Sequence, residues 1–406
     1  MPLQRKNEVK HGGTKRAASQ RASRLWSRLA VLPRAALNSL KTLPRRRPAG
    51  QPRRILIAHN LLLGDTLMLT ALIARLRQLH PHAEIVMTVA PAHLPLYSGS
   101  PYGVKAVAWD PHARDSFRQL QRVAADLPFD LAFVPGDNRH ALLARALGAR
   151  WIVALAGDRP SWKNRMADEL IALPPAPISL AEMFASLAGG AGDLQYDAVA
   201  WPAPAFAAFA LPKAPYAVLH VGARSPLRHW DAEKWLGLAA HLARRGLHIA
   251  WSAGPGEESL IEAMTQQTGT RQDSAFAGTL DLAQLWHLLA NSCILVAPDS
   301  GIAHLAKHAA TPTVCLFGPG SALLFGAGSF WRNAAFRAVT VENFPCRDQT
   351  LLFKRDITWV RRCQRATGET RTATTCHTAD CMHEITIAAV TGAADALLEG
   401  SARHAT

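Results

Sequence analysis

The residue types most able to do chemistry lie in one stretch, residues 294–306, which contains Asp299, Ser300 and Gly301. An apolar run ends just before Asp299 and a helical pattern begins after Gly301, so this stretch predicts a buried strand, a sharp polar turn and a helix. The first turn of such a helix presents backbone N–H groups that favour a phosphate or another anion. Ser300 can cap the helix, and Asp299 can accept hydrogen bonds from sugar hydroxyls. An ordinary capped turn between a strand and a helix has the same pattern.

A second polar turn follows the first predicted strand, residues 55–58. His59, Asn60 and Gly64 belong to its loop, and Asp65 opens a predicted helix that runs to about Leu79. A structural reading is that Asp65 serves only as an N-cap. Both polar turns follow directly on strands, and ligands of open α/β sheets bind beyond the carboxyl ends of their strands.

Length and composition set the class of protein. A chain of 406 residues, 49% of them apolar, is expected to form about two domains, each with a buried core. It contains no run of ~18 apolar residues that could span a membrane and no secretory signal. Six cysteines in a chain of this size do not suggest a disulfide framework, so we expect a cytoplasmic protein.

The positive charge is concentrated at the N-terminus. Residues 1–54 hold 15 Lys and Arg against one acid, Glu8, whereas the whole chain has a net charge of +15. The high isoelectric point therefore describes a tail and not the body of the protein. Such a tail indicates an anionic partner, which can be a membrane surface, a nucleic acid or an acidic glycolipid.

A basic amphipathic helix is predicted over residues 21–43, where apolar residues recur every three or four positions among arginines, with a break near Pro33. This pattern predicts contact of residues 21–47 with an anionic membrane at the inner face of the cytoplasmic membrane, where each basic residue contributes ~1 kcal/mol. A helix packed on the protein body and a disordered arm are the alternatives. Nucleic-acid binding is less favoured because no reader motif follows.

Strands and helices alternate over the rest of the chain, which predicts parallel, doubly wound sheets. In the first half we expect strands over 55–58, 84–89, 104–109, 131–135 and 150–155; in the second half, over 216–222, 247–253, 274–277, 293–297 and 312–317. A Pro- and Ala-rich stretch separates the two series. The expected parts are a basic arm (1–53), a first α/β domain (54–200), a linker (201–215), a second α/β domain (216–345) and a Cys-containing segment with a final helix (346–406).

The pattern Asp-Ser-Gly-x-x-His at 299–304, continued by a helix, a strand and Phe317-Gly318-Pro319, resembles the signature of the heptosyltransferase family, glycosyltransferase family 9. The similarity extends over roughly residues 54–398. In that family the segment meets the sugar and diphosphate of an ADP-heptose donor. The resemblance implies the GT-B fold class, with two doubly wound Rossmann-like domains facing across a cleft. It also implies a lipopolysaccharide-type glycolipid acceptor.

The resemblance also implies a catalytic residue. Gly64 and Asp65 directly follow the first strand, as a Gly-Asp pair does in the family, where the carboxylate is the general base for the acceptor hydroxyl. Such a base contributes ~10²–10⁴-fold to the rate, and direct attack by the acceptor inverts the anomeric centre. His59, Asn60 and Gly64 would then form the loop on the acceptor side.

Donor-binding residues are expected in the second domain. Arg228 stands where the family has a Lys that reaches the donor phosphates, and an Arg can pair with phosphate oxygens bidentately. Glu257 matches a ribose contact, and His304 matches the His of the signature helix. The expected donor set is Arg224, Ser225, Arg228, Glu257, Asp299, Ser300, Gly301 and His304. Solvated loop charges, a helix-dipole Glu and a core His are the structural alternatives. No Asp-x-Asp occurs, so we expect neither a divalent metal nor a cofactor.

Four cysteines gather near the C-terminus, with sixteen, twelve and four residues between them: Cys346, Cys363, Cys376 and Cys381. The family often carries a Cys-containing segment before a final Cys-Met-x-x-Ile, which residues 381–385 match. The spacing lacks paired Cys-x-x-Cys knuckles, so reduced thiols or a disulfide are favoured over a structural zinc site.

The sequence therefore predicts an inverting glycosyltransferase that moves a heptose, or a related sugar, from a nucleotide sugar to a glycolipid. Two alternatives remain open. One is another nucleotide-sugar enzyme of the same fold, such as an epimerase. The other is a catalytically silent protein that binds a membrane or a nucleic acid.

Overall fold

The computed structural model describes residues 30–43, 46–113, 115–125, 127–268, 274–342, 344–367 and 375–404. The chain divides into two compact units that interleave along the sequence. The first unit comprises Met1–Asn60, His82–Pro91 and Lys105–Ile171. The second comprises Leu61–Pro81, Ala92–Val104 and Ala172–Thr406. The two helices that follow the first strand therefore belong with the C-terminal part of the chain.

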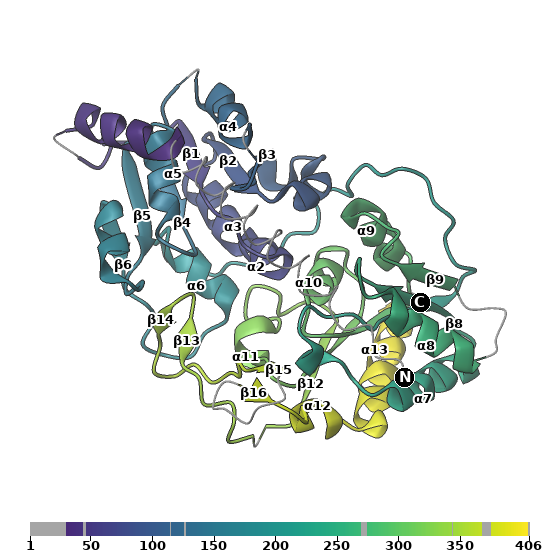
Figure 1. Cartoon of the computed structure of the whole chain (residues 1–406). Coiled ribbons are helices and arrows are strands. Elements are labelled where there is room, and N and C mark those ends of the chain that lie inside the picture. Colours follow the sequence, from purple (N-terminus) through teal and green to yellow (C-terminus); the bar gives the residue numbers. More distant parts are fainter. Residues whose placement is uncertain are drawn as a thin grey trace, which may run out of the picture. The chain divides into compact units, whose positions relative to one another are not determined.

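The first sheet has six strands in the order β3-β2-β1-β4-β5-β6 (Figure 1). The strands are β1 (Arg54–Ile57), β2 (Glu84–Val89), β3 (Val104–Ala108), β4 (Leu131–Val134), β5 (Trp151–Leu155) and β6 (Glu169–Ile171). The pairs from β2 through β1, β4 and β5 to β6 are parallel. Strand β4 is buried along its whole length, as is usual when both faces of a parallel sheet are covered.

The helices of the first half are α2 (Leu63–Met68), α3 (Thr70–Leu79), α4 (Ser116–Ala124), α5 (His140–Ala146) and α6 (Leu180–Ser186). Short 3-10 helices occur at Pro91–Tyr97, Pro101–Gly103 and Ser161–Met166. The single helix predicted from Asp65 to Leu79 is wrong in two respects: it begins earlier, at Leu63, and it is divided at Leu69. Strand β6 and the 3-10 helices were not predicted.

Residues 30–41 are helical and pack on the core of the first unit through Val31 and Ala35. The side-chain amide of Asn38 donates to the carbonyls of Arg145 and Ala146, at 3.0 and 3.2 Å. The helix continues through Pro33, so the predicted break does not occur there; proline near the beginning of a helix removes few hydrogen bonds. Residues 1–29 of the predicted arm, and Pro44 and Arg45, lie outside the described residues.

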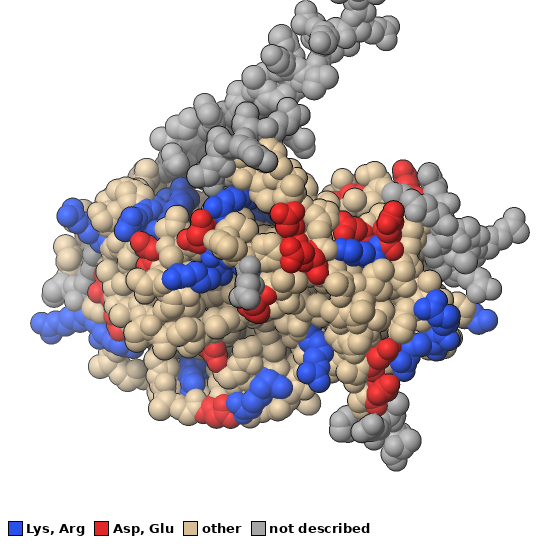
Figure 2. Space-filling view, turned by 90° about the horizontal axis from the view of Figure 1, so that it is seen from below, with Lys and Arg blue, Asp and Glu red and all other residues tan. Residues whose placement is uncertain are grey.

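The opposite side of this helix carries exposed leucines. Leu32, Leu37, Leu40 and Leu43 expose between 47% and 69% of their surface. Charge on the rest of the protein is nearly balanced, and on the face shown in Figure 2 blue and red side chains are interspersed. Within the described residues, no helix is both long enough and apolar enough to cross a bilayer.

The second sheet repeats the topology of the first, in the order β12-β11-β10-β7-β8-β9 (Figure 1). Its strands are β7 (Tyr216–His220), β8 (His248–Ala253), β9 (Ser274–Ala277), β10 (Ile294–Pro298), β11 (Thr313–Phe317) and β12 (Phe336–Thr340). All five pairs are parallel. Each sheet thus has its first and fourth strands side by side, which is the order of a Rossmann fold and its topological switch point. The predicted α/β class with two doubly wound sheets is confirmed.

Helices α7 (Ala232–Arg244), α8 (Glu258–Thr268), α9 (Leu282–Ala290) and α10 (Gly301–His308) alternate with these strands, and α11 (Ala322–Phe325) follows β11. A short 3-10 helix spans Pro226–Arg228. Two strand pairs, β13 (Leu351–Leu352) with β14 (Arg355–Asp356) and β15 (Ala366–Thr367) with β16 (Thr375–Cys376), precede α12 (Asp380–His383) and the final helix α13 (Ile387–His404).

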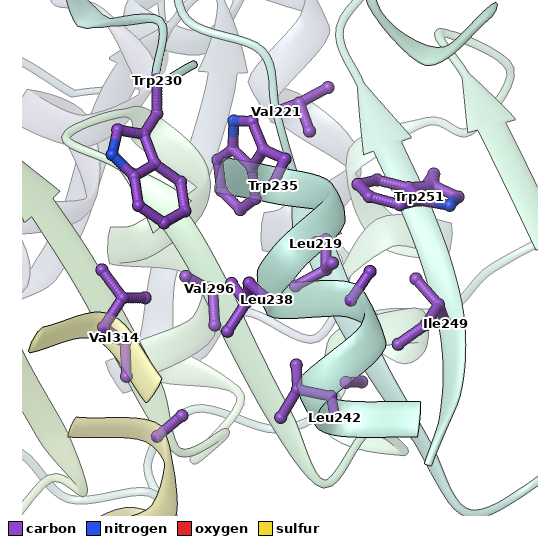
Figure 3. Packing of buried hydrophobic residues seen from close by; sticks show 14 of the residues in the cluster. Leu219, Val221, Trp230, Trp235, Leu238, Leu242, Ile249, Trp251, Val296 and Val314 are labelled. Carbon is purple, nitrogen blue, oxygen red and sulfur yellow. The ribbon is translucent and has the colours of Figure 1, made fainter. Parts of the chain in front are cut away.

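Tryptophans dominate the core of the second unit. Trp230 and Trp235 meet edge to face with their ring centroids 5.2 Å apart, and Trp251 is fully buried. Figure 3 shows these rings and the leucines of α7 gathered against side chains of the sheet. The indole of Trp230 donates to the carbonyl of Ile385 at 2.9 Å, which ties the segment before α13 to this core.

Candidate active site

Two helices of the second unit approach each other closely through glycines. An ideal Cβ placed on Gly64 of α2 would lie 2.9 Å from Cδ2 of His304 on α10. A Cβ on Gly301, the first residue of α10, would lie 2.9 Å from Cβ of Leu63. Both distances are shorter than carbon atoms tolerate, so glycine at both positions allows the contact. Gly64 and Asp65 of the first polar turn therefore lie in the same compact unit as the second polar turn and close to it.

A cavity of about 340 Å³ lies at this crossing. It brings together seven of the predicted site residues: Gly64, Asp65, Arg228, Asp299, Ser300, Gly301 and His304. Residues that were not predicted complete its lining: Leu62, Phe325, Leu352, Phe353, Lys354, Arg362 and Gln364. We call this space the active-site cavity.

Asp65 is the third residue of α2 and not its N-cap. Leu62 holds the cap position, and no side chain caps the helix there. The reading of Asp65 as a capping residue is therefore wrong, because packing against α10 starts the helix earlier. Burial raises the pKa of the Asp65 carboxyl from 3.8 to about 6; Arg362 and Arg228 lower it, and Asp299 raises it. Asp65 is thus mostly ionised at pH 7 and close to the range suited to a general base.

Arg228 and Asp299 form the other side of the active-site cavity. Nη1 of Arg228 donates to the main-chain carbonyl of Asp299 at 2.6 Å and lies 3.5 Å from its Oδ2. Asp299 is 4% exposed, and its N–H donates to the carbonyl of Leu316 on β11 at 2.9 Å. These contacts fix one guanidinium at the carboxyl end of β10, where α10 begins.

The N-terminus of α10 is open to a ligand. Ser300 is the N-cap residue, but its side chain makes no capping bond, and its buried Oγ has no hydrogen-bond partner among the described residues. The N–H groups of the first turn have no carbonyl of an earlier turn to bind. With the helix dipole, they form a site suited to a phosphate oxygen.

His304 lies one turn into α10 and is buried, and its Nδ1 also has no partner within the described part of the chain. Burial, together with the charges of Lys307, His308 and Arg228, holds the pKa of His304 well below its ordinary value. The imidazole is therefore neutral at pH 7, and it offers a hydrogen bond but no charge.

The last turn of α10 is held in place by contacts that were not predicted. Nε2 of His308 lies 2.9 Å from Oγ1 of Thr70 on α3. Lys307 is buried, donates to the carbonyl of Gly326 at 2.7 Å, and lies over the rings of Trp331 and Phe336. Burial lowers the pKa of Lys307 to about 7.

The C-terminal segment supplies the second guanidinium of the cavity. Cζ of Arg362 lies 5.4 Å from the centre of the Phe325 ring. Lys354 follows Phe353 at the tip of the β13–β14 hairpin, where both residues have positive φ, 64° and 47°. Such turns usually take Gly or Asn, and strained residues of this kind gather at functional sites. Phe353 stacks on Phe184 of α6 with centroids 5.9 Å apart, which fixes the tip.

The family model of glycosyltransferase family 9 (heptosyltransferase) matches residues 114–355, which is more than half of the chain. The chain belongs to this family. The protein is therefore a glycosyltransferase. Asp65 precedes the matched segment and Arg362 follows it, so both are placed at the cavity by the structure and not by the match.

Individual relatives agree with this assignment. Lipopolysaccharide heptosyltransferase 3 of Escherichia coli is 25% identical over 313 residues, which cover 70% of this chain and 89% of that protein. A family 9 glycosyltransferase of Veillonella parvula has a similar structure, with a TM-score of 0.66 at 16% identity, over 87% of this chain and all of the other. ADP-heptose LPS heptosyltransferase II of E. coli gives 0.63 at 19% identity, over 86% and 99%. These two structures show a shared fold, of the GT-B class.

Not all residues proposed from the heptosyltransferase resemblance line the active-site cavity. Arg224 is exposed and Ser225 half-buried on the loop after β7, and neither belongs to the lining. Glu257 directly precedes α8; its Oε2 accepts from the N–H of Gly254 at 2.9 Å and would lie 2.0 Å from a Cβ on Gly222. Glu257 therefore lies at the carboxyl ends of β7 and β8.

His59 and Asn60 belong to the first unit. The backbone of His59 exchanges two hydrogen bonds of 2.8 Å with Oγ1 of Thr88. Of the three residues assigned to the acceptor side, Gly64 alone lines the active-site cavity.

All six cysteines are free thiols, so the disulfide alternative is not realised in the structure. Nη1 of Arg365 lies 3.7 Å from Sγ of Cys363 and donates to the carbonyl of Cys346. The described residues contain no group of three or more His, Cys, Asp or Glu side chains that could hold a metal ion.

The first prediction concerns the close contact of α2 with α10 at Gly64 and Gly301. Gly64→Ala places a methyl group 2.9 Å from the His304 ring and should separate α2 from α10, with a loss of about 1–3 kcal/mol of unfolding free energy and of most activity. The control is Gly392→Ala in α13, where a Cβ meets no atom within 4 Å. It should leave activity unchanged and stabilise by up to about 1 kcal/mol. Urea unfolding measures stability, and ADP release measures activity. Equal stability and equal activity of the two variants would contradict the close contact of α2 with α10.

The second prediction concerns the raised pKa of Asp65. Because its folded-state pKa, about 6, exceeds the ordinary value of 3.8, folding favours the protonated carboxyl, and stability from this group falls as pH rises between those values. Asp65→Asn should therefore stabilise the protein by about 1–3 kcal/mol at pH 8 and by much less at pH 4.

Urea unfolding at both pH values tests this, with the exposed Asp115→Asn as a control that should change stability by less than about 0.5 kcal/mol. An Asp65→Asn variant that is less stable than the wild type at pH 8 would show that the carboxylate is favourably paired.

Proposed function

We infer that the protein transfers a heptose from ADP-heptose to a lipopolysaccharide-type glycolipid with inversion at the anomeric carbon. This inference rests on one observation. Asp65, whose pKa is raised, lines the same cavity as Arg228 and the first turn of α10, which together suit an anion. One side accepts a proton, and the other stabilises a departing anion.

In the proposed reaction, the acceptor hydroxyl attacks the anomeric carbon while Asp65 takes its proton. The new bond joins the acceptor oxygen to this carbon, and the bond from the carbon to the phosphate oxygen breaks. Its electron pair leaves with ADP. Attack from the face opposite to ADP inverts the centre, and no covalent intermediate with the protein is needed.

Charge on the leaving diphosphate is stabilised by groups already in position. Arg228 is held against the carbonyl of Asp299, and the N–H groups of α10 have no competing cap. Fixed donors of this kind, aimed where charge develops, supply much of the catalysis in group-transfer enzymes. Because these donors carry the charge, we expect transfer to proceed without a divalent metal.

The donor assignment is supported by the family and by the name of its E. coli member, ADP-heptose LPS heptosyltransferase II. Glu257 is proposed to accept from the ribose hydroxyls, because its carboxylate lies against Gly222 and Gly254 at the strand ends next to β10. Asp299 and His304 are proposed to bind the heptose hydroxyls. Arg224 and Ser225, on the loop after β7, remain proposed outer contacts of the donor.

The third prediction concerns the base. Asp65→Asn should lower kcat by ~10²–10⁴-fold while the affinity for ADP-heptose changes little, since only proton transfer is removed. For the wild type, kcat/KM should rise with pH through about 6, as the carboxyl ionises.

Acceptor-dependent release of ADP measures transfer. Thermal shifts with ADP-, GDP-, UDP- and dTDP-sugars measure donor binding. Near wild-type turnover in Asp65→Asn would remove Asp65 from the mechanism, and a shift with another nucleotide sugar but not with ADP-heptose would overturn the donor.

The N-terminal helix is proposed to bring the enzyme to the inner face of the cytoplasmic membrane. One side of residues 30–41 packs on the first unit, and the other exposes Leu37 and Leu40 next to the exposed Lys41. Apolar side chains flanked by basic residues are the composition of helices that lie in the interface of an anionic membrane.

The fourth prediction follows: Leu37→Asp combined with Leu40→Asp should weaken binding to phosphatidylglycerol-containing vesicles by at least ~10-fold, because two apolar contacts are lost and two like charges are added. Activity on a deacylated, water-soluble acceptor should not change. Leu211→Asp, at a leucine of similar exposure in the second unit, is the control. Equal vesicle binding by all three proteins would exclude this face as the anchor.

A further inference from the structure

A second cavity, of about 830 Å³, lies beyond the active-site cavity within the same unit. It is formed at the carboxyl ends of β11 and β12 and by the segment that follows them, and its lining includes Gly320, Leu324, Glu342, Trp359 and Arg361. The residues proposed to bind the donor come instead from the ends of β7, β8 and β10. None of the residues proposed above to bind the donor lines the second cavity.

The two cavities share a wall, which three pairs of residues define. A Cβ on Gly320, in the second cavity, would lie 2.2 Å from Oδ2 of Asp299, in the active-site cavity. Leu324 faces the second cavity, and its neighbour Phe325 faces the active site.

Arg361 and Arg362 divide between the two cavities in the same way. Arg362 pairs with Gln349 in an isolated antiparallel bridge, so the backbone is extended there and successive side chains point to opposite sides. A molecule that occupies both cavities has to pass only one layer of side chains.

Several polar groups of the second cavity serve only to build its wall. Arg347 donates to the carbonyls of Gly318 and Phe317, at 2.8 and 3.2 Å. Asp348 pairs with Arg365 at 2.8 Å. These groups fix the shape of the cavity, but they have little capacity left for a ligand.

Other groups remain available. Arg361 donates through Nη1 alone, to the carbonyls of Thr358 and Val360, while its Nη2 and Nε have no bond to any described residue. The Glu342 carboxylate likewise makes no hydrogen bond within the described chain and is exposed. The indole of Trp359 donates to the carbonyl of Pro174 at 2.9 Å, so its ring is held as a fixed apolar surface.

A carboxylate, a guanidinium and an anchored aromatic ring suit a polyhydroxylated ring better than other ligands. Sugar hydroxyls both donate and accept, so they can satisfy Glu342 and Arg361 together. A lipid chain would leave these groups without partners, and Glu342 would repel the phosphates of a nucleotide. A volume of about 830 Å³ is in the range of pockets that hold small ligands and suffices for one or two sugar rings.

We propose that the second cavity is a subsite for the acceptor glycan, which holds the sugar next to the one that receives the transferred residue. This proposal rests on the proposed function, since it assumes that the reacting hydroxyl lies beside Asp65. The Asp299 carboxylate fills the space beside Gly320, so the acceptor has to pass where Arg361 and Arg362 divide the two cavities. Arg361 and Glu342 select acceptors by the sugar that precedes the reacting one.

The fifth prediction tests this subsite. Calorimetric titration of the full chain, saturated with ADP, uses synthetic lipopolysaccharide inner-core oligosaccharides of one, two and three sugars. Wild-type protein should bind the two- and three-sugar compounds more tightly than the single sugar. Arg361→Gln and Glu342→Gln should each reduce that gain by about 10-fold or more and leave the affinity for ADP within twofold.

Arg337→Gln is the matched control, because this arginine is exposed on β12 and lines neither cavity. It should bind all three oligosaccharides like the wild type, and unchanged melting temperatures should accompany all three variants. Loss of ADP affinity in Arg361→Gln would assign the cavity to the nucleotide and overturn the proposal, as would equal binding by all variants or no gain with length. None of these three results would alter the loss of transfer expected in Asp65→Asn, which tests the proposed function separately.

Discussion

The close approach of α2 and α10 is the constraint on which the rest of the site depends. Gly64 and Gly301 lack the Cβ atoms that would lie 2.9 Å from the facing residues and force these helices apart. Because α2 carries Asp65 and α10 begins without a side-chain cap, the same contact places a carboxyl group beside the first turn of α10. The position of both groups is thus decided by the packing of the two helix backbones.

Charge in the active-site cavity is balanced by groups from distant parts of the sequence. Burial and the charge of Asp299 raise the pKa of Asp65, and Arg228 and Arg362 lower it. A cavity with two carboxylates and no guanidinium would hold protons at neutral pH, whereas one with two free guanidiniums would make Asp65 too weak a base. The charge of this cavity lies between these limits. A bound diphosphate would neutralise the cations, so it would raise the pKa of Asp65 and make it a stronger base.

Most of the fold could be predicted from the sequence because buried parallel strands give short apolar runs, as in β2, whose limits agree with those observed. Two edge strands were missed because β6 has only three residues and the charged Arg337 interrupts the apolar run of β12. The cap signal at Asp65 misled because tertiary packing, not a polar side chain, begins α2 at Leu63. Of the site, the two turns and Arg228 were foreseen. Arg362 and Lys354 were not, because no spacing rule connects a base near residue 65 with a segment near 360, and the Phe353–Lys354 turn lacks the glycine that marks most such turns.

The interleaving of the two units has a consequence for how such a protein can diverge. The chain passes between units after Asn60, Pro81, Pro91, Val104 and Ile171, so the Pro-rich stretch at 201–215 is not a seam between them. A genetic crossover within that stretch would join α2 from one parent to α10 from another, and the fit of Leu63 and His304 against the two glycines would have to survive by chance. We therefore expect Asp65 and its facing helix to be inherited as a pair, whereas the segment after β12, which lines the cavity without contributing to the contact of α2 with α10, is freer to change.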